Sequence, residues 1–174
     1  VDSSYLFSQP DGSGLPNVTY IQGENLNVKN TQNFARMFQN DKSLKSVDVG
    51  KWNVKNAVMV VHFPDDNHLG AMYQMFDGAS SLQTLDLSSW DTFAFQTAGG
   101  FGWLAMQDML RGTSSLWKIT LGPNTFLAAL SDFGGTVVIQ NAPGNNQKIG
   151  DSDEPPFYAS IDQTWQMVGN GTDH

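Results

Sequence analysis

The chain has 174 residues, a length at which one domain with a sizeable buried core is expected. Hydrophobic residues make up 40% of it and charged residues 15%, a balance that indicates a globular protein and excludes a disordered one. The net charge of −8 disfavours binding to nucleic acid or to an anionic membrane, and the absence of cysteine excludes disulfides, thiol catalysis and Cys-ligated zinc.

Residues 1–16 are polar and contain Asp11-Gly12-Ser13-Gly14, which predicts an entry segment or an N-terminal cap. The first residues lack the basic start and apolar core of a signal peptide, so we expect the chain to be a piece of something longer. No run of about 18 apolar residues occurs, and membrane insertion is therefore not expected.

A repeated unit follows, and it is clearest over residues 72–90. The spacing of Met72, Met75 and Phe76 predicts one face of a short helix, and Gly78 predicts the corner that ends it. A strand should come next, with its apolar residues in an L-x-x-L-x-L pattern formed by Leu82, Leu85 and Leu87.

The unit recurs once before and once after this copy, so that Leu44, Leu82 and Leu116 occupy equivalent places. A fainter half-copy, with Val18 and Ile21 in the places of Leu44 and Val47, precedes all three. The remaining equivalent apolar residues are Phe34, Met37, Phe38 and Val49 in the earlier copy, and Met106, Met109, Leu110, Ile119 and Leu121 in the later one.

Such a repeat predicts an α/β leucine-rich-repeat solenoid over residues 17–142, with a parallel sheet on one face and short helices opposite. Two insertions, at 57–69 and 93–104, lengthen the repeat, and residues 143–174 are predicted to form a C-terminal linker and cap.

The stretch from Met75 to Thr92 resembles the repeat of BspA-like leucine-rich-repeat surface proteins, with Ala79 in the place of their usual cysteine. Residues 165–172 also resemble a W-x-x-V-G-x-G-T segment that follows such repeats in wall-anchored proteins of Gram-positive bacteria. The resemblance implies an extracellular location on the bacterial cell surface and adhesion to host mucus, matrix proteins or other cells. The insertions after Trp52 and Trp90 depart from the family pattern.

Outward positions on the predicted strands supply the first candidate site. If Leu85 and Leu87 point inward, Thr84 and Asp86 point outward, and Asp48 occupies the place of Asp86 one layer earlier. Such a row of carboxylates could bind a cation or sugar hydroxyls, or it could be a solvated polar face.

Trp117 falls off the inward positions of its copy, beside Lys118, so we expect it to be exposed as a platform on which a sugar or peptide stacks. Trp52 and Trp90 recur at one repeat position and should be structural.

The insertions offer further candidates. Phe95 and Trp103 lie in the second insertion and would either pack on the flank of the solenoid or carry the recognition surface. In the first insertion His62, Asp65, Asp66 and His68 are acceptable zinc or calcium ligands, but their spacing matches no known metal loop and Asp66 would also serve as a helix N-cap.

No catalytic motif and no cofactor motif is present. The sequence therefore predicts a non-enzymatic binding module of a cell-surface adhesin, monomeric in isolation, whose partner is a host glycoprotein, mucin or matrix protein. The alternatives are a structural spacer that presents a neighbouring adhesive domain and a carbohydrate-active domain.

Overall fold

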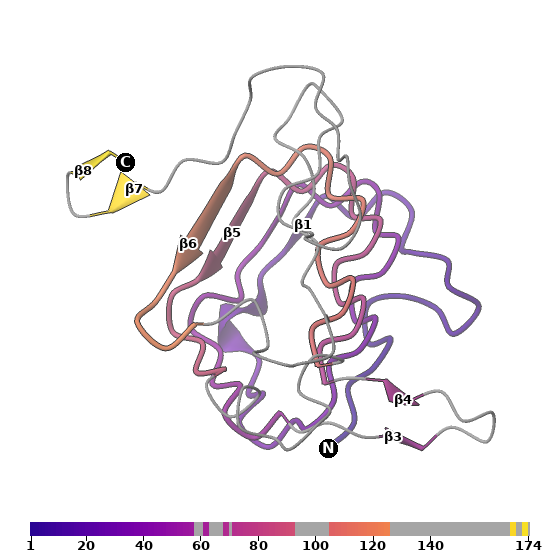
Figure 1. The fold of residues 1–174 in the computed structure, drawn as a ribbon. Helices are drawn as coiled ribbons and strands as arrows, with labels where there is room; N and C mark the ends of the chain where they lie inside the picture. The colour runs from indigo at the N-terminus through magenta and orange to yellow at the C-terminus, as the bar shows by residue number, and fades with distance from the viewer. Residues whose placement is uncertain are drawn as a thin grey trace.

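The computed structural model of the chain describes residues 1–57, 71–92 and 105–125, together with the backbone of four short strands outside these ranges. Strands lie along one side of the molecule and stacked turns along the other (Figure 1). The elements are β1 (Tyr20–Ile21), the 3₁₀ helix η1 (Gly23–Asn25), β2 (Ser46–Val47), β3 (Val61–His62), β4 (His68–Leu69), β5 (Thr84–Leu87), β6 (Lys118–Leu121), β7 (Val168–Gly169) and β8 (Thr172–Asp173).

The strands of successive repeats are parallel. β1 pairs with β2 and β5 pairs with β6, in registers that match equivalent positions of the repeat, such as Leu85 with Ile119. The bond from the Gln83 N–H to the Lys45 carbonyl (3.0 Å) joins the start of β5 to the start of β2. Four layers of the described chain are thus connected through their backbones. The two other strand pairs, β3 with β4 and β7 with β8, are antiparallel.

Opposite the strands, the segment over Met72–Phe76 forms tight turns instead of the predicted short helix. Its backbone N–H groups alternate: Met75 bonds to Met72 within the layer, whereas Phe76 bonds to the Met109 carbonyl of the next layer. In an α-helix the Phe76 N–H would bond to the Met72 carbonyl and would not reach the neighbouring layer. Apolar spacing did not separate the two structures, because tight turns also bury Met72, Met75 and Phe76.

Turn geometry in these segments requires left-handed backbone conformations at recurring positions. Arg36, Gln74 and Asp108 share one such position, with φ between 52° and 57°. Gly78 has the left-handed φ (+75°) that its place at the corner predicted. A Cβ at Gly78 would lie 2.3 Å from the Asn40 side-chain oxygen, so the stacking of the layers also requires glycine there.

The N-terminal segment forms one more turn layer of the same kind. Tyr5 has a positive φ like Arg36, and its N–H bonds to the Ala35 carbonyl (3.2 Å). The Phe7 ring stacks on Phe38 at 5.2 Å between centroids, and Phe38 stacks on Phe76 at 5.1 Å. Residues 3–8 therefore extend the stack of turns, beyond the entry or cap role predicted for residues 1–16.

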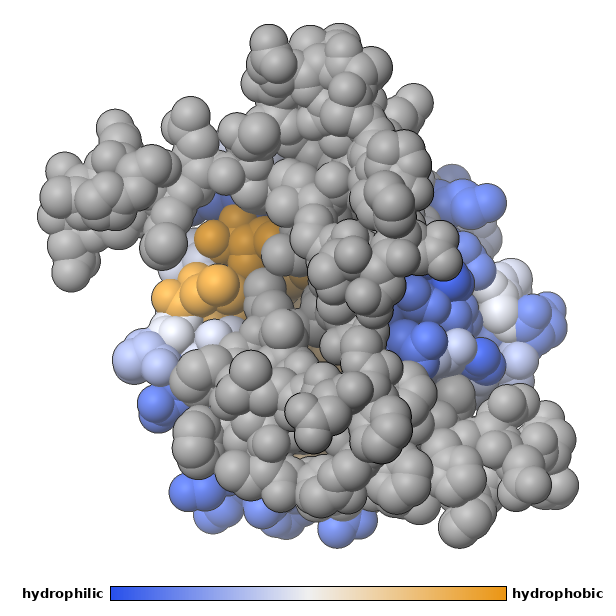
Figure 2. Space-filling model, viewed as in Figure 1, coloured by the Kyte–Doolittle hydropathy of each residue, from blue (hydrophilic) through white to orange (hydrophobic). Residues whose placement is uncertain are grey.

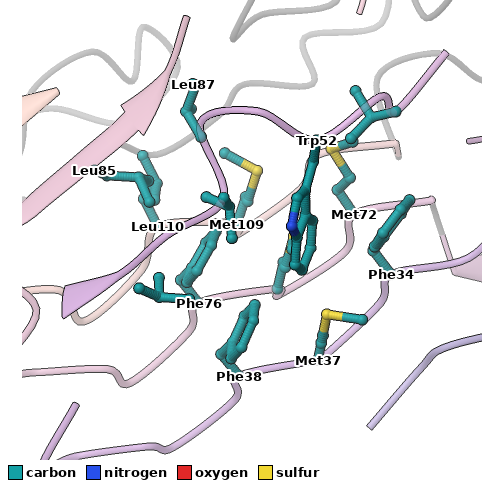
Figure 3. Close-up of a cluster of buried hydrophobic side chains, with 14 of the residues drawn as sticks. Phe34, Met37, Phe38, Trp52, Met72, Phe76, Leu85, Leu87, Met109 and Leu110 are labelled. Atoms are coloured by element: carbon teal, nitrogen blue, oxygen red, sulfur yellow. The ribbon is translucent and has the colours of Figure 1, made fainter. Parts of the chain in front are cut away.

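The core lies between the strands and the turns. Leu85 and Leu87 from the sheet side approach Phe76, Met109 and Leu110 from the turns (Figure 3). Leu44, Leu82 and Leu116 are fully buried, and each such side chain contributes about 1.5–3 kcal/mol by leaving water. The methionines at the equivalent apolar positions of the three copies are also buried, namely Met37, Met72, Met75, Met106 and Met109.

Two buried tryptophans tie neighbouring layers together. The Trp52 indole N–H donates to the Gly23 carbonyl (2.7 Å), and the Trp90 indole N–H donates to the Val49 carbonyl (2.9 Å). Each indole thus fills the core of its own layer and adds a second hydrogen bond to a carbonyl of the preceding one, which also accepts a backbone N–H. The structural role predicted for both residues is confirmed.

A buried carboxyl holds the loop that follows the first turn layer. Asp41 is fully buried, and its Oδ1 accepts a hydrogen bond from the Leu15 N–H (2.6 Å), whereas its Oδ2 has no partner. Burial raises the Asp41 pKa to about 6, against a smaller opposite effect of the Leu15 bond. The neighbouring Asn40 amide donates to the Gly12 carbonyl (2.6 Å), so adjacent side chains hold both ends of this loop.

Candidate functional site

The candidate site is the outward surface of β1, β2, β5 and β6, here called the strand face. Alternation along each strand buries Ile21, Val47 and Leu85 and turns the residues on either side of them outward. Because the strands are parallel and in register, the outward residues form rows that cross the layers. One row contains Tyr20, Ser46, Thr84 and Lys118, and the next contains Gln22, Asp48, Asp86 and Thr120.

Asp48 and Asp86 occupy the same step of adjacent layers, as their equivalent places in the repeat predicted. Backbone bonds from Gln83 to Lys45 and from Ser89 to Gly50 fix this alignment. Adjacent parallel strands are about 4.8 Å apart, so the two carboxylates lie on neighbouring strands of one surface.

Each carboxylate is held by a specific neighbour. The Tyr20 hydroxyl donates a hydrogen bond to Asp48 Oδ2 across one layer, and this bond raises the pKa of Tyr20. Asp86 Oδ1 accepts the Ser88 N–H (2.9 Å), and its carboxyl group lies against Gly50, where a Cβ would approach within 2.8 Å. The carboxylates are thus preoriented before any ligand binds.

Two exposed aromatic side chains belong to the first and the fourth strand layer: Tyr20 lies in β1, and Trp117 lies immediately before β6, level with Gln83. Trp117 is 58% exposed, as predicted, and Tyr20 is 51% exposed. Tyr20 belongs to the first strand layer and Trp117 to the fourth, so three strand spacings, about 14 Å, separate the two layers. Thr84, between them, is partly buried.

The hydropathy of the visible surface agrees with a predominantly polar exterior. Hydrophilic residues cover most of the described surface in Figure 2, and a hydrophobic patch lies on the side where Figure 1 places β6. Leu121 of β6 is 49% exposed, although it occupies the inward position that pairs with the buried Leu87.

The candidates in the two insertions are not tested by this geometry. Phe95, Trp103, Asp65 and Asp66 lie outside the described residues, as do the side chains of His62 and His68, whose backbones pair in β3 and β4. Among the described residues, no three His, Asp or Glu side chains form a cluster that could hold a metal ion.

A largely buried polar cluster, on the turn side, was not anticipated from the sequence. Asp77 accepts two bonds from the Arg111 guanidinium, from Nε (2.9 Å) and from Nη2 (2.7 Å), and also a bond from Gln39 Nε2 (3.2 Å). The pairing with Asp77 is the main cause that raises the Arg111 pKa. Gln39, Asp77 and Arg111 occupy equivalent places in the repeat, so an alignment of its polar positions would have indicated that these side chains lie next to one another.

The same network continues to the N-terminal layer. The Arg36 guanidinium donates to the hydroxyl of Tyr5 and to Gln74 Oε1 (3.0 Å), and it lies over the rings of Tyr5 and Tyr73 at 5.7 and 5.3 Å. These groups bond mainly to one another and across layers, which indicates that the turn-side cluster stabilises the stack.

Comparison with known proteins gave one result. The profile of a family described as "Mycoplasma protein of unknown function, DUF285" matches residues 17–118, which is more than half of the chain. No curated protein and no solved structure matched. Within the described residues, no helix is both long enough and apolar enough to cross a membrane.

Proposed function

This chain belongs to the DUF285 family, and from that premise we propose that it is a leucine-rich-repeat solenoid of the BspA-like type. The parallel registers β1–β2 and β5–β6 support this class, since successive repeats of a solenoid stack side by side. The tight turns take the place that helices have in longer leucine-rich repeats.

We propose that the chain is a non-enzymatic binding module of a bacterial cell-surface adhesin, located outside the cell. Its partner would be a host mucin, another glycoprotein or a matrix protein, and the strand face would be the contact surface. The observation that carries this proposal is the exposure of Trp117, because a tryptophan 58% exposed on a polar surface is a typical anchor for a partner.

The rival roles make different demands on the strand face. A spacer that only presents a neighbouring domain needs no exposed aromatic residues on it. A carbohydrate-active domain needs two carboxyl groups free to act on the bond to be broken, whereas Asp48 and Asp86 already accept hydrogen bonds from the Tyr20 hydroxyl and the Ser88 N–H. The binding module uses all of these features.

The test is binding of the intact chain to immobilised mucin and fibronectin, compared with Trp117→Ala and with a variant that lacks residues 93–104. Trp117 is exposed, so its replacement should leave folding unchanged. Binding lost in Trp117→Ala supports the strand face, and binding lost only in the deletion variant moves the contact to the insertion. No binding by the intact chain to either surface favours the spacer and contradicts the proposal.

A further inference from the structure

We propose that the ligand of the strand face is a neutral oligosaccharide, about four pyranose units long, that crosses the strands from Tyr20 to Trp117. This inference rests on the proposed binding function and narrows its partner to one chemical class. It follows from three properties of the strand face: the separation of its aromatic ends, the polar rows between them and the balance of its charges.

The aromatic ends set the length. Tyr20 and Trp117 are each more than half exposed and stand three strand layers apart, about 14 Å. A pyranose ring is about as long as one strand spacing, so two rings stacked on the aromatics leave room for two more between them. The C–H groups of a β-linked pyranose present an apolar face that matches an exposed aromatic ring.

The rows between the aromatics offer what sugar hydroxyls require. Ser46 and Thr84 present hydroxyls, which donate and accept, and Asp48 and Asp86 present carboxylate oxygens, which form strong charge-assisted bonds with hydroxyl donors. The bonds from Tyr20 to Asp48 and from Ser88 to Asp86 fix both carboxylates in advance. Less conformational freedom is therefore lost when a ligand binds.

The charges select a neutral ligand. The outward rows carry two carboxylates, Asp48 and Asp86, and two ammonium groups, Lys118 and the neighbouring Lys45. Asp48 and Asp86 repel a sulfated or sialylated glycan, and the overall charge of −8 adds to that repulsion. The two lysines in turn disfavour a basic peptide. A chain of uncharged hydroxylated rings complements this surface.

The experiment is calorimetric titration of the intact chain with β-linked oligomers of glucose, galactose and N-acetylglucosamine, from one to six units, and with heparin. Affinity for at least one series should rise up to about four units and then level off. Trp117→Ala and Tyr20→Ala should each weaken binding at least tenfold, whereas Trp117→Phe should retain most of it. Leu6→Ala is the matched control, because Leu6 is also exposed (55%) but lies in the first turn layer.

Several results would overturn the inference. Oligomers that bind equally well to Trp117→Ala and Tyr20→Ala would place the site elsewhere, and tighter binding to heparin than to every neutral series would contradict the charge argument. Trp117-dependent binding to mucin stripped of its glycans or to fibronectin, with no oligomer bound, would refute the glycan while the binding function stands. Binding to none of these probes would refute both.

Discussion

The buried carboxyl of Asp41 gives a quantitative prediction about the stability of the fold. Its side chain is fully buried, Oδ2 has no partner, and burial raises its pKa from 3.8 to about 6. A shift of that size means that the folded state favours the protonated over the ionised carboxyl by about 3 kcal/mol more than the unfolded state does. Because the folded-state pKa lies above the unfolded-state value, the contribution of the protonated Asp41 to the free energy of unfolding is fully present below pH 3.8 and is lost as the pH rises through 6.

Asp41→Asn keeps the shape of the side chain and an oxygen for the Leu15 N–H, but it cannot ionise. We expect the variant to be more stable than the wild type by about 2–3 kcal/mol at pH 8 and by less than about 0.5 kcal/mol at pH 3.5. Urea unfolding of both proteins across this range measures the difference.

The matched control is Asp11→Asn. Asp11 lies in the loop that Asp41 holds through the Leu15 N–H. It is exposed, and its hydrogen bonds with Ser13 lower its pKa. Its replacement therefore cannot produce a stabilisation that grows with pH. Parallel stability curves for the wild type and Asp41→Asn would refute the assignment of a raised pKa to the buried carboxyl.

Three further predictions concern the stack, and urea unfolding measures each of them. Gly12→Ala should lower the free energy of unfolding by about 1–2 kcal/mol, because Gly12 has a positive φ but open space around it. Gly78→Ala should lower it by about 1–3 kcal/mol more, because the added Cβ would also meet the Asn40 side chain. Equal losses in the two variants would contradict the close approach of the layers. Trp52→Phe should lose about 0.5–1.5 kcal/mol because the bond from the indole N–H to the Gly23 carbonyl is lost while that carbonyl keeps its bond from the Leu26 N–H, and a neutral effect would show that the indole bond does not stabilise the layers. Arg111→Lys should lose about 1 kcal/mol, since Lys cannot form the paired bonds to Asp77; no such loss should follow in an Asp77→Asn background.

The sequence was most informative where burial follows a short period. The L-x-x-L-x-L spacing correctly predicted that Leu82, Leu85 and Leu87 are buried, because one register of β5 turns Leu85 and Leu87 inward together and Leu82 lies in the segment that leads into the strand. Trp117 was correctly predicted to be exposed because it lies off the inward positions of its copy, immediately before β6.

The sequence was less informative where different backbones bury the same residues. Met72, Met75 and Phe76 would share one side of a helix, and they also share one side of consecutive tight turns. The left-handed φ at Gln74 separates the two structures, and nothing about a glutamine residue predicts it.

The sequence also did not predict contacts between layers whose turns and strands are linked by segments of different length. The sequence separation between the stacked turn residues Phe7 and Phe38 is larger than that between the paired strand residues Tyr20 and Ser46. The segment that links the first turn layer to β1 is therefore longer than the segment that links the second turn layer to β2. A gap-free alignment of the repeat copies therefore includes the half-copy around β1 but not the turn layer of residues 3–8 that precedes it. The bond from Tyr20 to Asp48 depends on how two side chains meet across layers, which residue spacing alone does not specify.

The most direct test of the account follows the indole N–H signals of the chain by NMR while a mucin glycopeptide is added. The Trp117 signal is identified by its absence in Trp117→Phe. We predict that it shifts on binding, whereas the signals of Trp52 and Trp90, which are buried and bonded to backbone carbonyls, stay in place. A glycopeptide that binds while the Trp117 signal remains unchanged would contradict the claim that the strand face is the contact surface.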